Sequence, residues 1–167
     1  METILTILLA TAIFGGRILH LYLKRRRREL LYPVEAGPTS DAKEDFTKPV
    51  SVRIGGMKKT PGLDYFVVRN ECMRPMGICP DDIIGVQLFD DEFTIKDVEE
   101  GDVLLIELND DNFRGRKIRV MDHAEKEAFV TYYYVGTKKR QQSSKTHSFE
   151  CIRGVVREVN HPYSDAA

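Results

Sequence analysis

Short runs of apolar, β-branched and aromatic residues recur along the chain from residue 50 onward, separated by turn signals. Runs of this length between turn residues are typical of β-strands, so the pattern predicts a compact, mainly β domain. The predicted strands cover residues 50–54, 65–69, 83–88, 103–108, 117–121, 128–135 and 149–159. We therefore predict one β-domain at residues 49–160, with a short tail at 161–167.

The beginning of the chain has a different pattern, an apolar run over residues 4–23 that ends at the basic run 24–28. About 20 apolar residues are what a helix needs to cross a bilayer. We predict that residues 1–28 form a transmembrane anchor helix with a basic end. Arg17 is close enough to that end to reach the interface with its long side chain. The alternative is an amphipathic helix lying in the membrane surface.

The charges at the two ends of this helix predict its orientation in the membrane. No Lys or Arg precedes the apolar run. The segment therefore lacks the basic start that a cleavable secretory signal has. Lys and Arg favour the cytoplasmic side of a membrane. We expect a single-pass membrane protein whose C-terminal domain lies in the cytoplasm. Residues 29–48 are rich in Pro, Gly, Ser, Thr and acidic residues without any period, which predicts a flexible linker.

Composition excludes some classes of function. The 167 residues include 25 Lys and Arg against 26 Asp and Glu, so net charge indicates no nucleic-acid binding. Three cysteines, at positions 72, 79 and 151, lack metal-ligand spacing, and their odd number favours a reduced compartment. The four histidines are scattered. We therefore expect neither a metal site nor another cofactor.

The most informative segment is residues 65–86, where an apolar strand leads to Cys72-Met73 and a Pro-Asp-Asp turn starts the next strand. It resembles the nucleophile segment of the superfamily that joins LexA-type and UmuD-type self-cleaving proteins to type I signal peptidases. Residues 98–106 resemble that family's Gly-Asp-Val turn and central strand, and residues 151–157 its closing Gly-Val-Val strand. The resemblance implies a LexA/signal-peptidase-like β-domain. Asp81 replaces the Gly of the family's Gly-Asp turn, where a positive φ would favour Gly.

The resemblance also implies a catalytic dyad, in which a neutral, desolvated Lys deprotonates the nucleophile. The family's Ser position is Cys72 here, and a thiol ionises more readily than a hydroxyl. The family's Lys lies on the strand after the Gly-Asp-Val hairpin, where Lys117 is the match. A slip of two residues would offer Arg119, which stays protonated and cannot be a base. The alternative is an exposed basic strand without a catalytic lysine, with Cys72 as a small apolar residue.

A candidate scissile bond lies in the predicted linker. Self-cleaving relatives cut an Ala-Gly or Cys-Gly bond some three dozen residues before their nucleophile. This chain carries Ala36-Gly37, and Ala36 precedes Cys72 by 36 positions. Small residues suit a backbone that must enter a narrow cleft. The alternative is that this pair is ordinary linker sequence.

Three functions follow from these features. The first is a membrane-anchored peptidase that cuts its own linker at Ala36-Gly37 with the dyad Cys72 and Lys117. The second is a degenerate peptidase domain that holds a peptide or a partner. The third is signal-peptidase-like processing of other membrane proteins. The expected partners are the membrane, through the N-terminal helix, and the chain's own linker or a peptide substrate. Related domains commonly dimerise through β-strands, so a homodimer is an open alternative.

Overall fold

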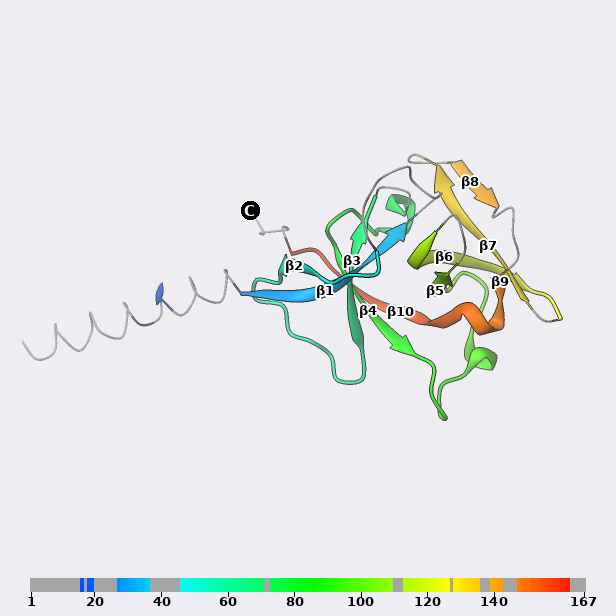
Figure 1. Cartoon of the computed structure of the whole chain (residues 1–167), viewed down its shortest axis with the longest axis horizontal. Coiled ribbons are helices and arrows are strands. Elements are labelled where there is room, and N and C mark those ends of the chain that lie inside the picture. The colour runs from blue at the N-terminus through cyan, green and yellow to red at the C-terminus, as the bar shows by residue number, and fades with distance from the viewer. Residues whose placement is uncertain are drawn as a thin grey trace, which may run out of the picture.

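The computed structural model describes residues 16, 18–19, 27–36, 46–70, 73–109, 113–126, 128–135, 139–142 and 147–162. The domain is mainly β, as the alternation of apolar residues predicts (Figure 1). Within the described ranges the strands are β1 (Arg28–Ala36), β2 (Val50–Arg53), β3 (Asp64–Arg69), β4 (Ile83–Leu88), β5 (Val103–Asn109), β6 (Arg114–Ala124), β7 (Ala128–Val135), β8 (Lys139–Gln142), β9 (His147–Ser148) and β10 (Ile152–Asn160). Three short 3-10 turns are η1 (Arg74–Met76), η2 (Ile95–Asp97) and η3 (Phe149–Cys151).

Most predicted strands are confirmed. The strands at 83–88 and 128–135 have the predicted bounds, and β6 is longer at both ends than the predicted 117–121. The last strand starts at Ile152 rather than at residue 149, because η3 precedes it and Ser148 caps this turn by accepting a hydrogen bond from the Glu150 N–H. The predicted pattern missed β1, β8 and β9.

Six of the described strands close into a barrel in the order β1, β3, β4, β10, β5 and β6, with β6 returning to β1. The pairs from β3 round to β6 are all antiparallel. By contrast, β1 runs parallel to both of its barrel neighbours, β3 and β6. Strand β2 pairs with the first half of β1, and β7 continues the sheet from β6.

The barrel interior is apolar, and each barrel strand contributes alternate residues to it, as the period of two in a strand requires. This interior cluster includes Val34 and Ala36 of β1, Val68 of β3 and Ile118 of β6. Residues of the opposite parity form two further clusters on the outer face, such as that around Leu104. The interior is therefore complete only when β1 is in place.

The prediction of a flexible linker at residues 29–48 is wrong for residues 29–36, which form most of β1. Its composition concealed the strand, because Pro and Glu, here Pro33 and Glu35, are depleted in strands generally. Val34 and Ala36 point into the core and are fully buried, and Glu35 is buried on the opposite face. Residues 37–45 lie outside the described residues. The β-domain thus begins at β1 rather than at residue 49.

The predicted membrane helix lies almost entirely outside the described residues. Gly16, Ile18 and Leu19 are the described positions of the segment 4–23, and all three are helical. Within the part of the chain that the structure describes, no helix combines the length and the apolar character needed to cross a bilayer.

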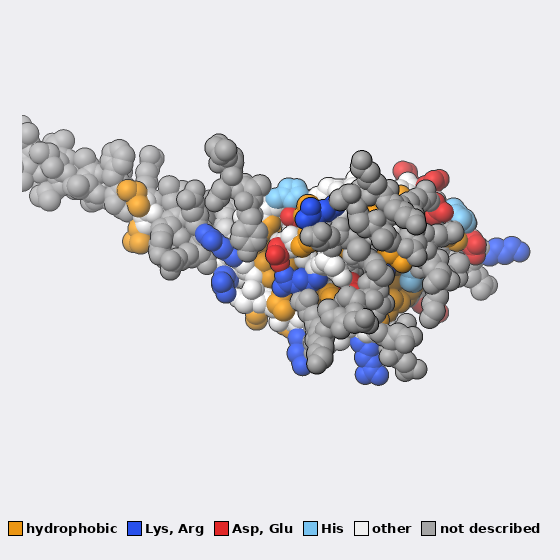
Figure 2. Space-filling view, turned by 90° about the horizontal axis from the view of Figure 1, so that it is seen from above, with side chains coloured by type: hydrophobic (Ala, Val, Ile, Leu, Met, Phe, Trp, Pro, Cys, Tyr) orange, Lys and Arg blue, Asp and Glu red, His pale blue; other side chains and the backbone are white. Residues whose placement is uncertain are grey.

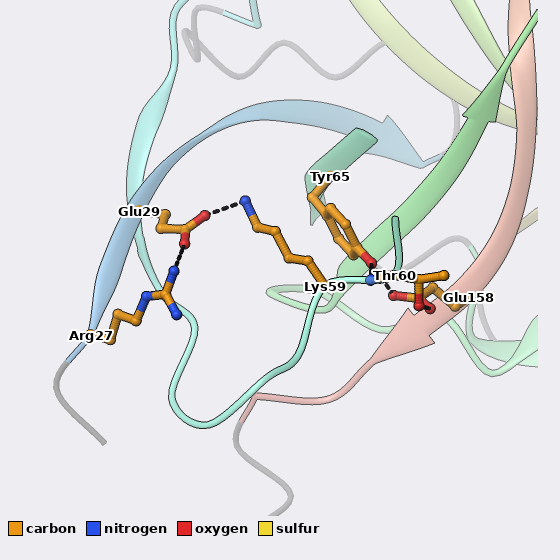
Figure 3. A network of polar contacts seen from close by, with 6 residues as sticks. All are labelled: Arg27, Glu29, Lys59, Thr60, Tyr65 and Glu158. Carbon is orange, nitrogen blue, oxygen red and sulfur yellow. Dashed lines mark hydrogen bonds and ion pairs between the residues drawn. The ribbon is translucent and has the colours of Figure 1, made fainter. Parts of the chain in front are cut away.

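Polar contacts hold the beginning of β1 and the loop before β3 against the barrel (Figure 3). Glu29 of β1 is ion-paired with Arg27 at 2.7 Å and also with Lys59 of the loop. The hydrogen bond from Lys59 is the main reason that the pKa of Glu29 lies below its ordinary range. The same loop reaches β10, where contacts at 2.6–2.8 Å join Thr60, Tyr65 and Glu158.

The substitution Glu158→Gln is expected to lower the thermal unfolding midpoint at neutral pH and to change little well below pH 4.5. The hydrogen bond from Tyr65 is the main cause that lowers the pKa of Glu158 below its usual 4.5. A carboxylate whose pKa is lowered by folding adds stability above its unfolded pKa, and this stability disappears as the pH falls through the folded value. Thermal melts across this pH range measure the effect, with the exposed Glu100→Gln as a control without effect. An equal loss at every pH would contradict the role of the charge.

Candidate functional site

Three strands position the described residues of the predicted site, Ala36 and Lys117. Strand β1 lies between β3 and β6, and its register places Glu35 beside Arg69 on one side and beside Lys117 on the other (Figure 1). The next residue, Ala36, is the last described residue of β1 and lies beside Ile118. In the sequence, β3 precedes Cys72 by three residues. Ala36 therefore lies between the strand that carries the predicted base and the strand that precedes the predicted nucleophile.

Lys117 is buried, with 3% of its surface exposed, and its Nζ lies 2.8 Å from Oε2 of Glu35, which is 0% exposed. The ammonium also lies 4.0 Å from the centre of the Phe113 ring. Phe46 packs on Phe113, with ring centres 5.5 Å apart, and its Cβ would collide with any side chain added at Gly115. The two aromatic rings and the close approach at Gly115 keep water away from the lysine.

Lys117 and Arg119 are buried, so the alternative of an exposed basic strand is wrong for these two residues, whereas the catalytic role of Lys117 stays a prediction. Arg119 shares a face of β6 with Lys117, as alternation predicts, and only 5% of its surface is exposed. Its guanidinium lies 4.9 Å from the centre of the Tyr133 ring and donates to the Ile118 carbonyl at 2.8 Å. Each of the two basic residues thus has its own set of contacts, and Lys117 is the one that faces β1.

Glu35 is the residue of the site that sequence reasoning missed. The feature that could have located it is a carboxylate flanked by two apolar residues, Val34 and Ala36, whose side chains both enter the core. Asn70 joins the group, because its Nδ2 donates a long hydrogen bond of 3.5 Å to Oε1 of Glu35. A buried carboxylate requires such partners, since burial of an isolated charge is costly.

Asn70 also holds the end of β1. The chain leaves β3 at this residue, which has a φ of 63°, a conformation that Asn tolerates better than most residues. Its side-chain Oδ1 accepts a hydrogen bond of 3.1 Å from the Ala36 N–H. This bond extends the contacts of β1 beyond the last paired residue of β3. The backbone immediately before the predicted scissile bond is therefore tied to the segment that leads to Cys72.

Ala36 is packed in the barrel interior. It is 0% exposed and belongs to the interior cluster together with Met73 and Ile78. The residue before the predicted scissile bond is therefore part of the core. Gly37, on the other side of that bond, lies outside the described residues.

The predicted nucleophile, Cys72, also lies outside the described residues, and its proximity to Lys117 stays a prediction. The described residues on either side, Asn70 and Met73, are both held in place. Met73 is fully buried, and its carbonyl accepts hydrogen bonds from Met76 and Ile78 at 2.9 and 3.2 Å. Met73 is therefore part of the apolar packing of the barrel interior.

The turn after the nucleophile segment has the backbone shape that favours Gly in the family. Asp81 has a φ of 67°. Asp is one of the residues that tolerates this left-handed conformation, because its short polar side chain bonds locally. Its carboxylate is ion-paired with Arg69 of β3, which is the strand neighbour of Glu35. The turn therefore keeps its shape without Gly.

Two open cavities on the described surface, of about 470 and 410 Å³, are lined by neither Glu35 nor Lys117. The second lies at one end of the barrel. Its arginines, Arg116 and Arg153, are both ion-paired with Glu107. Figure 2 shows basic, acidic and hydrophobic side chains interspersed on one face of the molecule.

Comparisons of this chain with protein-family models, with curated proteins and with solved structures found no match.

Proposed function

We propose that the chain is a membrane-anchored, cytoplasm-facing peptidase of the LexA/UmuD type that cuts itself between Ala36 and Gly37. Cys72 is the nucleophile and Lys117 is the general base. One observation carries the proposal: β1 includes Ala36, the residue directly before the predicted scissile bond, and is held between β3, which precedes Cys72 in the sequence, and β6, which carries Lys117. The membrane anchor in this proposal is the N-terminal helix that the sequence predicts.

The chemistry is an acyl transfer in two steps. Lys117, as the neutral amine, takes the proton of the Cys72 thiol, and the thiolate attacks the carbonyl carbon of Ala36. The bond to the Gly37 nitrogen breaks, and this nitrogen leaves as an amine with the proton from Lys117. Water then hydrolyses the thioester between Cys72 and Ala36, giving a carboxylate at Ala36 and the free thiol.

The sheet contributes by positioning. A bond that is held in place beside its nucleophile reacts as an intramolecular group, which removes much of the entropic cost of the reaction. Strand β1 is fixed by ladders on both sides, by the Asn70 bond and by the burial of the Ala36 side chain. The rate of cutting should therefore be independent of protein concentration.

The ion pair between Glu35 and Lys117 favours a second function, a degenerate peptidase domain that holds a peptide strand without cutting it. A carboxylate at 2.8 Å favours the charged ammonium, which cannot accept a proton. In this function β1 is a permanent strand of the barrel. Processing of other membrane proteins is less favoured, because β1 already fills the space between β3 and β6.

The test is the fate of a C-terminally tagged full-length protein in cells. We expect an intact band in the membrane fraction and a shorter band in the soluble fraction whose N-terminus is Gly37. Cys72→Ala should abolish the shorter band, whereas Cys72→Ser should retain it by restoring the family's nucleophile. Cys79→Ala, which removes another cysteine of the same segment, is the matched control and should be cut normally. A single intact band for both the natural protein and Cys72→Ser would favour the degenerate domain.

A further inference from the structure

We infer that Glu35 controls the charge of Lys117 and thereby restrains self-cleavage by raising the pH at which Lys117 can act as a base. This inference rests on the proposed function, and it concerns the regulation of the same site. The strand that carries the scissile bond would then also carry the group that restrains its own cleavage. Glu35 precedes that bond by one residue and reaches Lys117 from the neighbouring strand.

Among the described residues, the charged and polar groups near Lys117 and its ion pair include side chains of β1, of β6 and of the end of β3. From β1, Glu35 supplies a carboxylate at 2.8 Å, and Asn70, directly after β3, contacts the other oxygen of that carboxylate. Arg69 of β3 is ion-paired with Asp81. On β6 itself, Arg119 lies over the ring of Tyr133. The ladder partner of Lys117 on β5 is Ile106, which is apolar.

This arrangement opposes the loss of the lysine proton. If Lys117 became neutral while β1 stayed seated, Glu35 would remain as a buried carboxylate without its counter-charge. Burial by Phe46 and Phe113 by itself would favour the neutral amine, because desolvation disfavours charge. The carboxylate acts in the opposite direction and at hydrogen-bond distance. Removal of its charge should therefore let burial dominate and make Lys117 a base at a lower pH.

The inference differs from a purely structural role for the ion pair. A structural pair affects stability, whereas a charge-controlling pair also sets the pH at which Lys117 loses its proton. That pH is the decisive measurement. It can be followed in the full-length Cys72→Ala protein in detergent by NMR of lysine labelled at Cε, with Lys117→Arg assigning the signal.

We expect Glu35→Gln, which removes the charge and keeps the shape, to lower the titration midpoint of Lys117 by at least about one pH unit. In the protein with Cys72 intact, the pH profile for formation of the Gly37 N-terminus should shift to lower pH by the same amount. The matched control is Glu29→Gln, the same change on the same strand, at an ion pair with Arg27 and Lys59. It should leave both profiles unchanged. Glu35→Asp, which keeps the charge on a shorter side chain, should give a midpoint between those of the natural protein and Glu35→Gln.

The outcomes separate the inference from the proposed function. If Lys117 titrates at the same pH in the natural protein and in Glu35→Gln, the inference is overturned, whether or not the chain is cut. A shifted titration without cutting in any variant would support the control of charge and reject the peptidase. If Glu35→Gln does not fold, Glu35→Asp replaces it, and an unchanged titration in that variant overturns the inference.

Discussion

The substitution Lys117→Met is expected to lower the free energy of unfolding by about 3–5 kcal/mol, because it leaves Glu35 buried without its counter-charge. Both side chains of the pair are almost fully buried, so water cannot replace the lost contact. The double variant Glu35→Leu with Lys117→Met should recover most of the loss, since an apolar pair often substitutes for a buried ion pair at little cost. Denaturant unfolding measures both effects.

The control for this prediction is Lys96→Met, at an exposed position of η2, where we expect little change. A loss below about 1 kcal/mol for Lys117→Met would instead match an exposed ion pair and contradict the buried site. The substitution Lys117→Arg separates the contribution of Lys117 to stability from its role as the general base. It keeps a positive charge opposite Glu35 but cannot act as a base, so we expect a folded protein that is not cut.

The substitution Ala36→Asp is expected to abolish cutting and to lower the free energy of unfolding by several kcal/mol, about the cost of burying an unpaired polar group. Ala36 belongs to the apolar cluster inside the barrel, so a carboxylate there must either lose its charge or pull the end of β1 out of the sheet. Denaturant unfolding and the tagged-protein blot measure the two effects.

Two further substitutions on the same strand make this test specific. Ala36→Gly removes one methyl group and should cost about 1 kcal/mol while cutting continues. Leu30→Asp places the same carboxylate at a position that is 70% exposed and should be tolerated. If Ala36→Asp were as harmless as Leu30→Asp, the end of β1 would not be seated in the core.

The sequence alone determined those features that depend on local chemistry. Short apolar and β-branched runs between turn signals predicted β4 and β7 to the residue, because such runs favour a strand that the fold buries. The turn at Asp81 was located by its Pro-Asp-Asp sequence, and the period of two in a strand placed Lys117 and Arg119 on a common face. Each of these features is decided by residues within a few positions of one another.

Only the tertiary structure decided the role of residues 28–36. Their Pro and Glu content is that of a linker, and β1 is a strand because the gap between β3 and β6 supplies parallel ladders and a core for Val34 and Ala36. The partner of Glu35 could not be predicted for the same reason. Lys117 is distant in the sequence, and only the closure of the barrel brings its ammonium to the carboxylate. A charge becomes acceptable in a buried strand when a non-local partner compensates it, and such a partner leaves no signal in the local sequence pattern.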